Sequence, residues 1–200
     1  MLDFLLNLLT IYVKVFAIID PFAAIPTYLT LTEDFDERRR NEIIRKAFVA
    51  MTFMVIVFTL MGVWILNFFG ITINSLRVAG GSILVVLAFD MLGEAPRSKK
   101  LEPGEIAVMP IATPLLVGPG TMTTIILSTL ENPSISGYLT VLTASLMAVA
   151  TATIILKYSE FLVKKLSKSF IKGLGRFMTI IIAATGFEMI KAGVMGWLSG

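Results

Sequence analysis

Two long uncharged stretches constrain the fold more than any other feature of this 200-residue sequence. Ala47–Gly70 and Ile135–Leu156 contain no Asp, Glu, Lys or Arg, and each is longer than the roughly 20 residues that cross a bilayer core as a helix. Hydrophobic residues make up 56% of the chain and charged residues only 16%, which leaves too little polar surface to cover a soluble globule. The sequence therefore predicts an integral membrane protein.

Further apolar stretches extend this prediction to an all-α membrane protein with six transmembrane helices. Ile106–Leu130 is also uncharged, and the remaining three spans, which tolerate some interruptions, are Leu2–Thr32, Ile71–Leu92 and Phe177–Leu198. A β-barrel is disfavoured, because its strands alternate apolar and polar residues. Met51–Leu66 is instead apolar on every face.

The distribution of positive charge predicts the orientation in the membrane. Lys and Arg cluster after spans one, three and five, at Arg38, Arg39, Arg40, Arg45, Lys46, Arg97, Lys99, Lys100, Lys157, Lys164, Lys165, Lys168, Lys172 and Arg176. Because basic loops stay in the cytoplasm, both chain termini are expected outside. Lipid headgroups account for basic clusters beside spans, so no nucleic-acid partner is expected. The N-terminal stretch lacks a basic region ahead of it and is predicted to be a retained first span.

The residue types present exclude several kinds of chemistry. The chain has no cysteine and no histidine, which rules out disulfides, thiolate metal sites and Ser–His catalysis. Asp20 and Asp90 are expected at different depths, so they do not form an aspartyl catalytic pair. No nucleotide-binding loop is present. We therefore expect no enzyme activity, no metal and no cofactor.

A repeated proline pair indicates that the chain consists of two related halves. Pro21 and Pro26 have the same spacing as Pro114 and Pro119. The predicted halves are residues 1–95 and 105–200, with a cytoplasmic linker at 96–104 between them. Each half contains three spans, an odd number, so the second half enters the bilayer from the opposite face. The result is a pair of inverted three-helix repeats, an arrangement found in transporters.

The prolines also predict that helices 1 and 4 are broken near mid-membrane. Proline removes a helical hydrogen bond and leaves a carbonyl group without its donor. Free backbone groups persist in a bilayer only where protein buries them or water reaches them. Spans one and four should therefore meet at the centre of the bundle.

These motifs resemble those of the MarC family of membrane proteins, whose halves open with segments like "IIDPFAAIP" (Ile18–Pro26) and "ATPLLVGPGTMTT" (Ala112–Thr124). The resemblance covers the whole chain. It implies a permease for small neutral amino acids, such as glycine, alanine, serine or threonine, in the cytoplasmic (inner) membrane of a prokaryote.

The predicted substrate site surrounds the two helix breaks. Free amides after Pro119 would bind the substrate carboxylate, since Gly118 and Gly120 permit close approach and positive φ angles. The equivalent half-helix is expected after Pro26. Asp20 is the candidate for the substrate ammonium group, although it could equally cap the following half-helix without touching a ligand. The full set of predicted substrate-binding residues is Asp20, Pro21, Pro26, Thr27, Thr113, Pro114, Gly118, Pro119, Gly120 and Thr121.

Two acidic residues are candidates for coupling transport to a proton or sodium ion. They are Asp20 and Glu188, although Glu188 is three residues from Lys191 and the two could simply neutralise each other. The small-residue segments Ala79–Ser82 and Gly193–Gly196 are expected to pack helices within the chain, and they also suit a homo-oligomer interface. Transport of another small metabolite, a channel and a membrane scaffold remain alternative functions at this stage.

Overall fold

The computed structural model describes residues 2–93 and 116–199, which form helices and no strand. The helices are α1 (Leu2–Ile19), α2 (Pro21–Leu31), α3 (Glu37–Phe68), α4 (Ile73–Leu92), α5 (Pro119–Glu131), α6 (Ile135–Lys157), α7 (Ser159–Leu166) and α8 (Lys168–Leu198). The helical segments long and apolar enough to cross a membrane are Phe4–Leu31, Glu37–Phe68, Ile73–Leu92, Ile135–Lys157 and Ser169–Leu198. The predicted all-helical membrane protein is confirmed. The residues expected to begin span four, from 106 to 115, lie outside the described residues.

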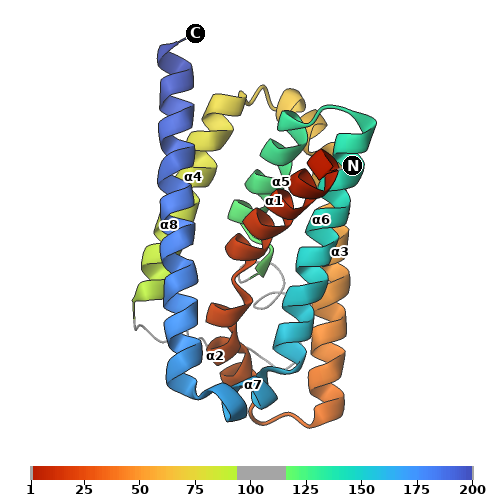
Figure 1. The fold of residues 1–200 in the computed structure, drawn as a ribbon, viewed down its shortest axis with the longest axis vertical. Helices are drawn as coiled ribbons and strands as arrows, with labels where there is room; N and C mark the ends of the chain where they lie inside the picture. The colour runs from red at the N-terminus through yellow and green to blue at the C-terminus, as the bar shows by residue number, and fades with distance from the viewer. Residues whose placement is uncertain (1, 94–115, 200) are drawn as a thin grey trace.

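The helices form an upright bundle around α5 (Figure 1). On one side α4 packs along α8, and on the other α1 and α3 pack on α6. Helix α5 contacts α1, α3, α4 and α6, and most of its residues are buried. At 13 residues, α5 is about 20 Å long, too short to cross the hydrocarbon core alone.

The break in the first span lies at Asp20, between α1 and α2 (Figure 1). Asp20 adopts the left-handed conformation, with φ 41° and ψ 67°. Pro21 then occupies the first position of α2, where its fixed φ favours a helix and no amide hydrogen is needed. Our expectation that the half-helix begins after Pro26 was wrong, because Pro26 lies inside α2.

Glycine at the second break does not take the conformation that we expected. Gly118 precedes α5 with φ −89° and ψ −173°, which is extended backbone. Gly120 is helical, and among the described glycines only Gly70 has a positive φ. The prediction of positive φ at Gly118 and Gly120 was therefore wrong. Pro119 enters the helix directly from an extended residue, a conformation favoured before proline.

Part of the charged sequence at one end of the bundle belongs to the helices. A short turn covers residues 32–36, and α3 then begins at Glu37, where the Asp36 carboxylate accepts a hydrogen bond from the amide of Arg39 at 2.8 Å. Likewise α8 begins at Lys168, well before the apolar segment at Phe177, with Ser167 capping the amide of Phe170 at 3.3 Å. Side-chain caps at both starts satisfy amides that would otherwise lack acceptors.

The two basic clusters within the described residues lie at the same end of the bundle. They occupy the start of α3 and the region from the end of α6 through α7 to the start of α8, at the bottom of Figure 1. An ion pair between Arg40 and Glu160 joins α3 to α7, and the Arg40 Nε group donates to the carbonyl of Thr32 at 2.9 Å. Both chain termini lie at the opposite end (Figure 1).

The small-residue segments pack helices within the chain, as predicted. A Cβ atom at Gly81 would meet the carbonyl oxygen of Gly186 at 2.5 Å, and one at Gly186 would meet the carbonyl oxygen of Gly81 at 2.7 Å. Nearer the chain's end, Gly193 faces the Asn74 carbonyl and Gly196 faces the Asn74 side chain. These pairings show that α4 and α8 run antiparallel in close backbone contact, which only small residues permit.

Candidate functional site

Asp20 is a buried acid, and only one of its two carboxylate oxygens accepts a hydrogen bond from the described residues. Its side chain lies at the helix break, and the residue is 1% exposed. Oδ1 accepts a hydrogen bond from the amide of Ala23 at 3.1 Å, which caps α2. Oδ2 is buried and has no hydrogen-bond partner among the described residues. The predicted capping role is thus present, and it leaves one carboxylate oxygen available for another ligand.

Backbone carbonyl groups add to the negative character of this break. The carbonyl of Ala17 would normally pair with residue 21, which is a proline without an amide hydrogen. The carbonyl of Ile19 would pair with Ala23, whose amide is donated to Asp20 instead. Both residues are buried. The end of α1 therefore has carbonyl groups without their usual helical donors, and the negative end of its dipole, beside Asp20.

The start of α5 has the opposite character. Gly118 provides no side-chain cap, and Pro119 has no amide hydrogen. The amide of Met122 donates to the carbonyl of Gly118 at 3.0 Å, so the helix geometry leaves the amides of Gly120 and Thr121 without helical acceptors. Both residues are buried. The first turn of α5 thus presents donors and the positive end of its dipole.

The two breaks lie next to each other in the bundle. A Cβ atom at Gly120 would lie 3.6 Å from Ile18 at the end of α1, and it would overlap the side chain of Leu84 on α4. Gly120 therefore allows Leu84, which is fully buried, to pack on the first turn of α5. This contact brings spans one and four together, as the sequence predicted. Thr113 and Pro114 lie outside the described residues.

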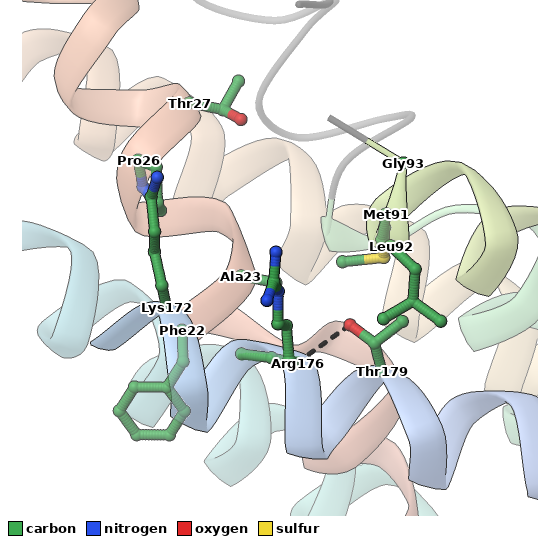
Figure 2. A pocket seen from close by; sticks show the side chains of 11 residues that line it. Phe22, Ala23, Pro26, Thr27, Met91, Leu92, Gly93, Lys172, Arg176 and Thr179 are labelled. Carbon is green, nitrogen blue, oxygen red and sulfur yellow. Dashed lines mark hydrogen bonds between the residues drawn. The ribbon is translucent and has the colours of Figure 1, made fainter. Parts of the chain in front are cut away.

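A cavity of about 430 Å³ opens beside the first break, between α2, α4 and α8 (Figure 2). Two of the predicted site residues, Pro26 and Thr27, line it from α2. Thr179 on α8 lines the cavity and also faces the carboxylate of Asp20. Asp20 itself lies behind this wall, since it is almost fully buried. The cavity leads toward the break from the basic end of the bundle.

Comparison with known proteins identifies the family. The family model described as "MarC family integral membrane protein" matches residues 5–198. The chain belongs to the MarC family. The sequence-based resemblance is thereby confirmed.

Relatives of this MarC protein occur in archaea and bacteria. It is 32% identical to the UPF0056 membrane protein MJ1677 of Methanocaldococcus jannaschii, covering 92% of this chain and 94% of that protein. It is 31% identical to the UPF0056 membrane protein YvbG of Bacillus subtilis, covering 93% of each, and 31% identical to PYRAB13050 of Pyrococcus abyssi, covering 98% of each. No solved structure matches the chain.

Glu188 lies apart from the helix break in this MarC chain. Its side chain is 73% exposed and pairs with Lys191 at 3.4 Å on the outer face of α8. It is nine residues along α8 from Thr179, or roughly 13 Å. The structure thus brings Asp20 together with the starts of α2 and α5, and it does not bring Glu188 to them.

Sequence reasoning missed the contribution of α8 to this region of the MarC fold. Thr179, Lys172 and Arg176 all line the cavity. In the sequence, Lys172 and Arg176 belong to the basic cluster that predicts the orientation in the membrane. The spacing of these residues could have shown that they share one face of α8. Lys172 and Arg176 are four residues apart, and Thr179 follows three residues later, and residues three or four apart lie on the same helix face.

Proposed function

We propose that this MarC protein is a secondary transporter of small neutral amino acids that works by alternating access. The observation that carries the proposal is the buried Asp20 carboxylate, one oxygen of which has no partner. A buried acid without full pairing is costly in a membrane protein and is by default functional. A bound ammonium group would supply the missing donors.

The two helix breaks together suit a zwitterion. The amides of Gly120 and Thr121, at the positive end of α5, would bind the carboxylate of the substrate. Asp20 and the free carbonyls at the end of α1 would bind its ammonium group. Discontinuous helices in transporters bind substrate groups in this way. In this proposal, the side chain of Leu84, which packs on the first turn of α5, limits the size of the substrate side chain.

The packing of the bundle supports an inverted repeat with six crossings. If α1–α4 and α5–α8 are the two halves, then α4 packs on its counterpart α8 and α3 packs on its counterpart α6, while span one contacts span four through α1 and α5. Such pairing is expected around an axis in the membrane plane. Helix α4 ends at the basic end and α6 begins at the other end (Figure 1). The proposal therefore includes one crossing between α4 and α6.

In this proposal, the basic end faces the cytoplasm and both termini face outward. The chain lacks cysteine, so single cysteines can report the orientation. We expect a membrane-impermeant maleimide added to intact cells to label Ser136→Cys, at the start of α6, and to spare Lys164→Cys on α7. Both positions are exposed. The reverse labelling pattern would contradict this orientation.

The direct test is uptake of labelled glycine and alanine into proteoliposomes, with proton and sodium gradients imposed separately. Saturable accumulation above equilibrium under one gradient supports a carrier and identifies the coupling ion, for which Asp20 is the leading candidate. Uptake that only equilibrates and does not saturate would favour a channel. Absence of uptake under every gradient would exclude these substrates.

Leu84 is expected to determine the size limit for substrates. Its contact with Gly120 places its side chain where a larger substrate would extend, so Leu84→Ala should raise valine uptake relative to glycine by about tenfold, the effect of one or two methylene groups in an apolar pocket. Competition of valine against labelled glycine measures this ratio. Ile182→Ala is the matched control, since Ile182 is equally buried in the same apolar cluster. Equal ratios in the two variants would refute the assignment.

A further inference from the structure

A cavity of about 660 Å³ lies on the side of α3, close to the basic start of this helix. The described residues that line it are Arg45, Lys46, Val49, Ala50 and Phe53. Arg45, Val49 and Phe53 follow one another at intervals of four residues, as do Lys46 and Ala50, so all five lie on one side of the helix. We call this surface the α3 cavity. A single helix thus supplies both its cations and its apolar residues.

The α3 cavity extends from charged residues into the apolar part of the span. Arg45 and Lys46 directly precede the uncharged stretch that begins at Ala47, which places them at the level of the lipid headgroups. Phe53 is eight residues beyond Arg45, or roughly 12 Å further along the helix. Val49 and Phe53 are 61% and 67% exposed, and they lie within a helix that is long and apolar enough to cross a membrane. Acyl chains can therefore contact this part of the cavity.

Positive charge remains at the headgroup end of the α3 cavity after the local ion pair is counted. Lys46 pairs with Glu42, one turn earlier on the same helix, at 2.8 Å. Arg39 and Arg45 also interact electrostatically with the Glu42 carboxylate. Arg45 forms no ion pair within residues 2–93 and 116–199. The charge of Glu42 offsets only one of these cations, so a phosphate group at this end would meet a net positive charge.

An anionic phospholipid matches both parts of the α3 cavity. Its phosphate group carries the charge that Arg45 attracts, and its acyl chains match the exposed Val49 and Phe53. A free inorganic anion would leave the apolar part of the cavity unused. A second copy of the chain, packed through the same surface about an axis along the membrane normal, would place the cations of both copies at the same depth and facing each other, because a twofold interface pairs each patch with itself.

We propose that the α3 cavity binds one anionic phospholipid, whose phosphate group lies at Arg45 and Lys46 and whose acyl chain lies along Val49, Ala50 and Phe53. The proposal concerns the outer surface of α3 and does not depend on transport or on any substrate. Because a ligand that binds only the folded state adds to its stability, occupancy of the site stabilises the protein.

Fluorescence quenching of a tryptophan in the α3 cavity measures lipid binding there. The reporter protein carries Phe53→Trp, while Trp64→Phe and Trp197→Phe remove the two native tryptophans. It is reconstituted in phosphatidylcholine vesicles in which a rising fraction of the lipid is brominated phosphatidylglycerol or, separately, brominated phosphatidylcholine. We expect the association constant at the reporter to favour phosphatidylglycerol about fivefold or more. Equal constants for the two lipids would overturn the proposal.

Substitutions of Arg45 test whether this preference comes from the α3 cavity. In the reporter protein, Arg45→Gln should lower the preference about three- to fivefold, as expected for loss of one basic residue near the membrane surface, whereas Arg45→Lys should keep most of it. Arg38→Gln is the matched control, since Arg38 is an exposed cation on the same helix and is not among the lining residues. An equal loss in the control would mean that the overall surface potential attracts the lipid, and it would overturn the site.

Two measurements on other forms of the chain test the alternative occupants. We expect phosphatidylglycerol to raise the melting midpoint of the wild-type protein in detergent more than phosphatidylcholine does. Stabilisation by inorganic phosphate, with none by phosphatidylglycerol, would identify a soluble anion and contradict the proposal. The chain has no native cysteine, so a Phe53→Cys variant reports contact between copies, and we expect no disulfide-linked dimer in vesicles. Complete cross-linking, equal with and without phosphatidylglycerol, would identify a second copy as the occupant and would also contradict it.

Discussion

An Asp20→Asn variant is expected to fold normally and to lose glycine transport. Asparagine caps helices as well as aspartate does, so its Oδ1 atom can keep the hydrogen bond to the amide of Ala23. The change removes the charge and puts an amide donor in place of Oδ2, the oxygen without a partner. Hydrogen bonds to a charged group contribute about 1.5–3 kcal/mol, so we expect initial uptake to fall about ten- to a hundredfold.

Asp36→Asn is the matched control for this experiment. Asp36 also caps a helix, since its carboxylate accepts a hydrogen bond from Arg39 at 2.8 Å, but it is exposed at the basic end. Its replacement should leave uptake within about twofold of the wild type, because surface substitutions rarely change more. Both variants should elute and melt like the wild type in detergent. Equal uptake by Asp20→Asn and wild type would show that Asp20 only caps α2.

The position of the first break illustrates how far the sequence could predict the site. Two prolines identified the segment, because each removes a helical hydrogen bond. They did not show which of them begins the new helix. That choice depends on Asp20, whose side chain captures the amide of Ala23 and whose left-handed conformation is one that Asp tolerates better than most residues. Pro26 then lies within α2, where it lines the cavity between α2, α4 and α8.

The contributions of α4 and α8 could not be predicted, because they depend on contacts between distant parts of the chain. Leu84 is an ordinary apolar residue in sequence, and its role follows only from its contact with Gly120. Thr179 faces Asp20 because Gly175 lets α8 approach α2. Long apolar stretches predicted the helices, because bilayer thickness sets the length of each span separately. Runs of Lys and Arg predicted the basic end, because the orientation rule applies to each loop separately. Contacts between two segments cannot be predicted from the hydropathy or charge of either segment alone.

The glycine contact between α4 and α8 leads to the second large prediction. Gly186→Val should destabilise the protein by about 3 kcal/mol or more, at the upper end of what overpacking costs. A Cβ atom at Gly186 would meet the backbone carbonyl of Gly81 at 2.7 Å and Val85 at 2.8 Å, and backbone cannot move aside as a flexible side chain can. The midpoint of thermal unfolding in detergent measures the loss.

Gly173→Val provides the matched control, because Gly173 lies on the same helix and a Cβ atom there would have no neighbour within 4 Å. Both substitutions change the helix propensity of α8 equally, so the difference between their melting temperatures isolates the contact with α4. Similar melting temperatures would mean that α4 and α8 can separate at little cost. The proposed inverted repeat would then lose its central contact, since α4 and α8 are counterparts in the two halves and pack closest where Gly81 faces Gly186.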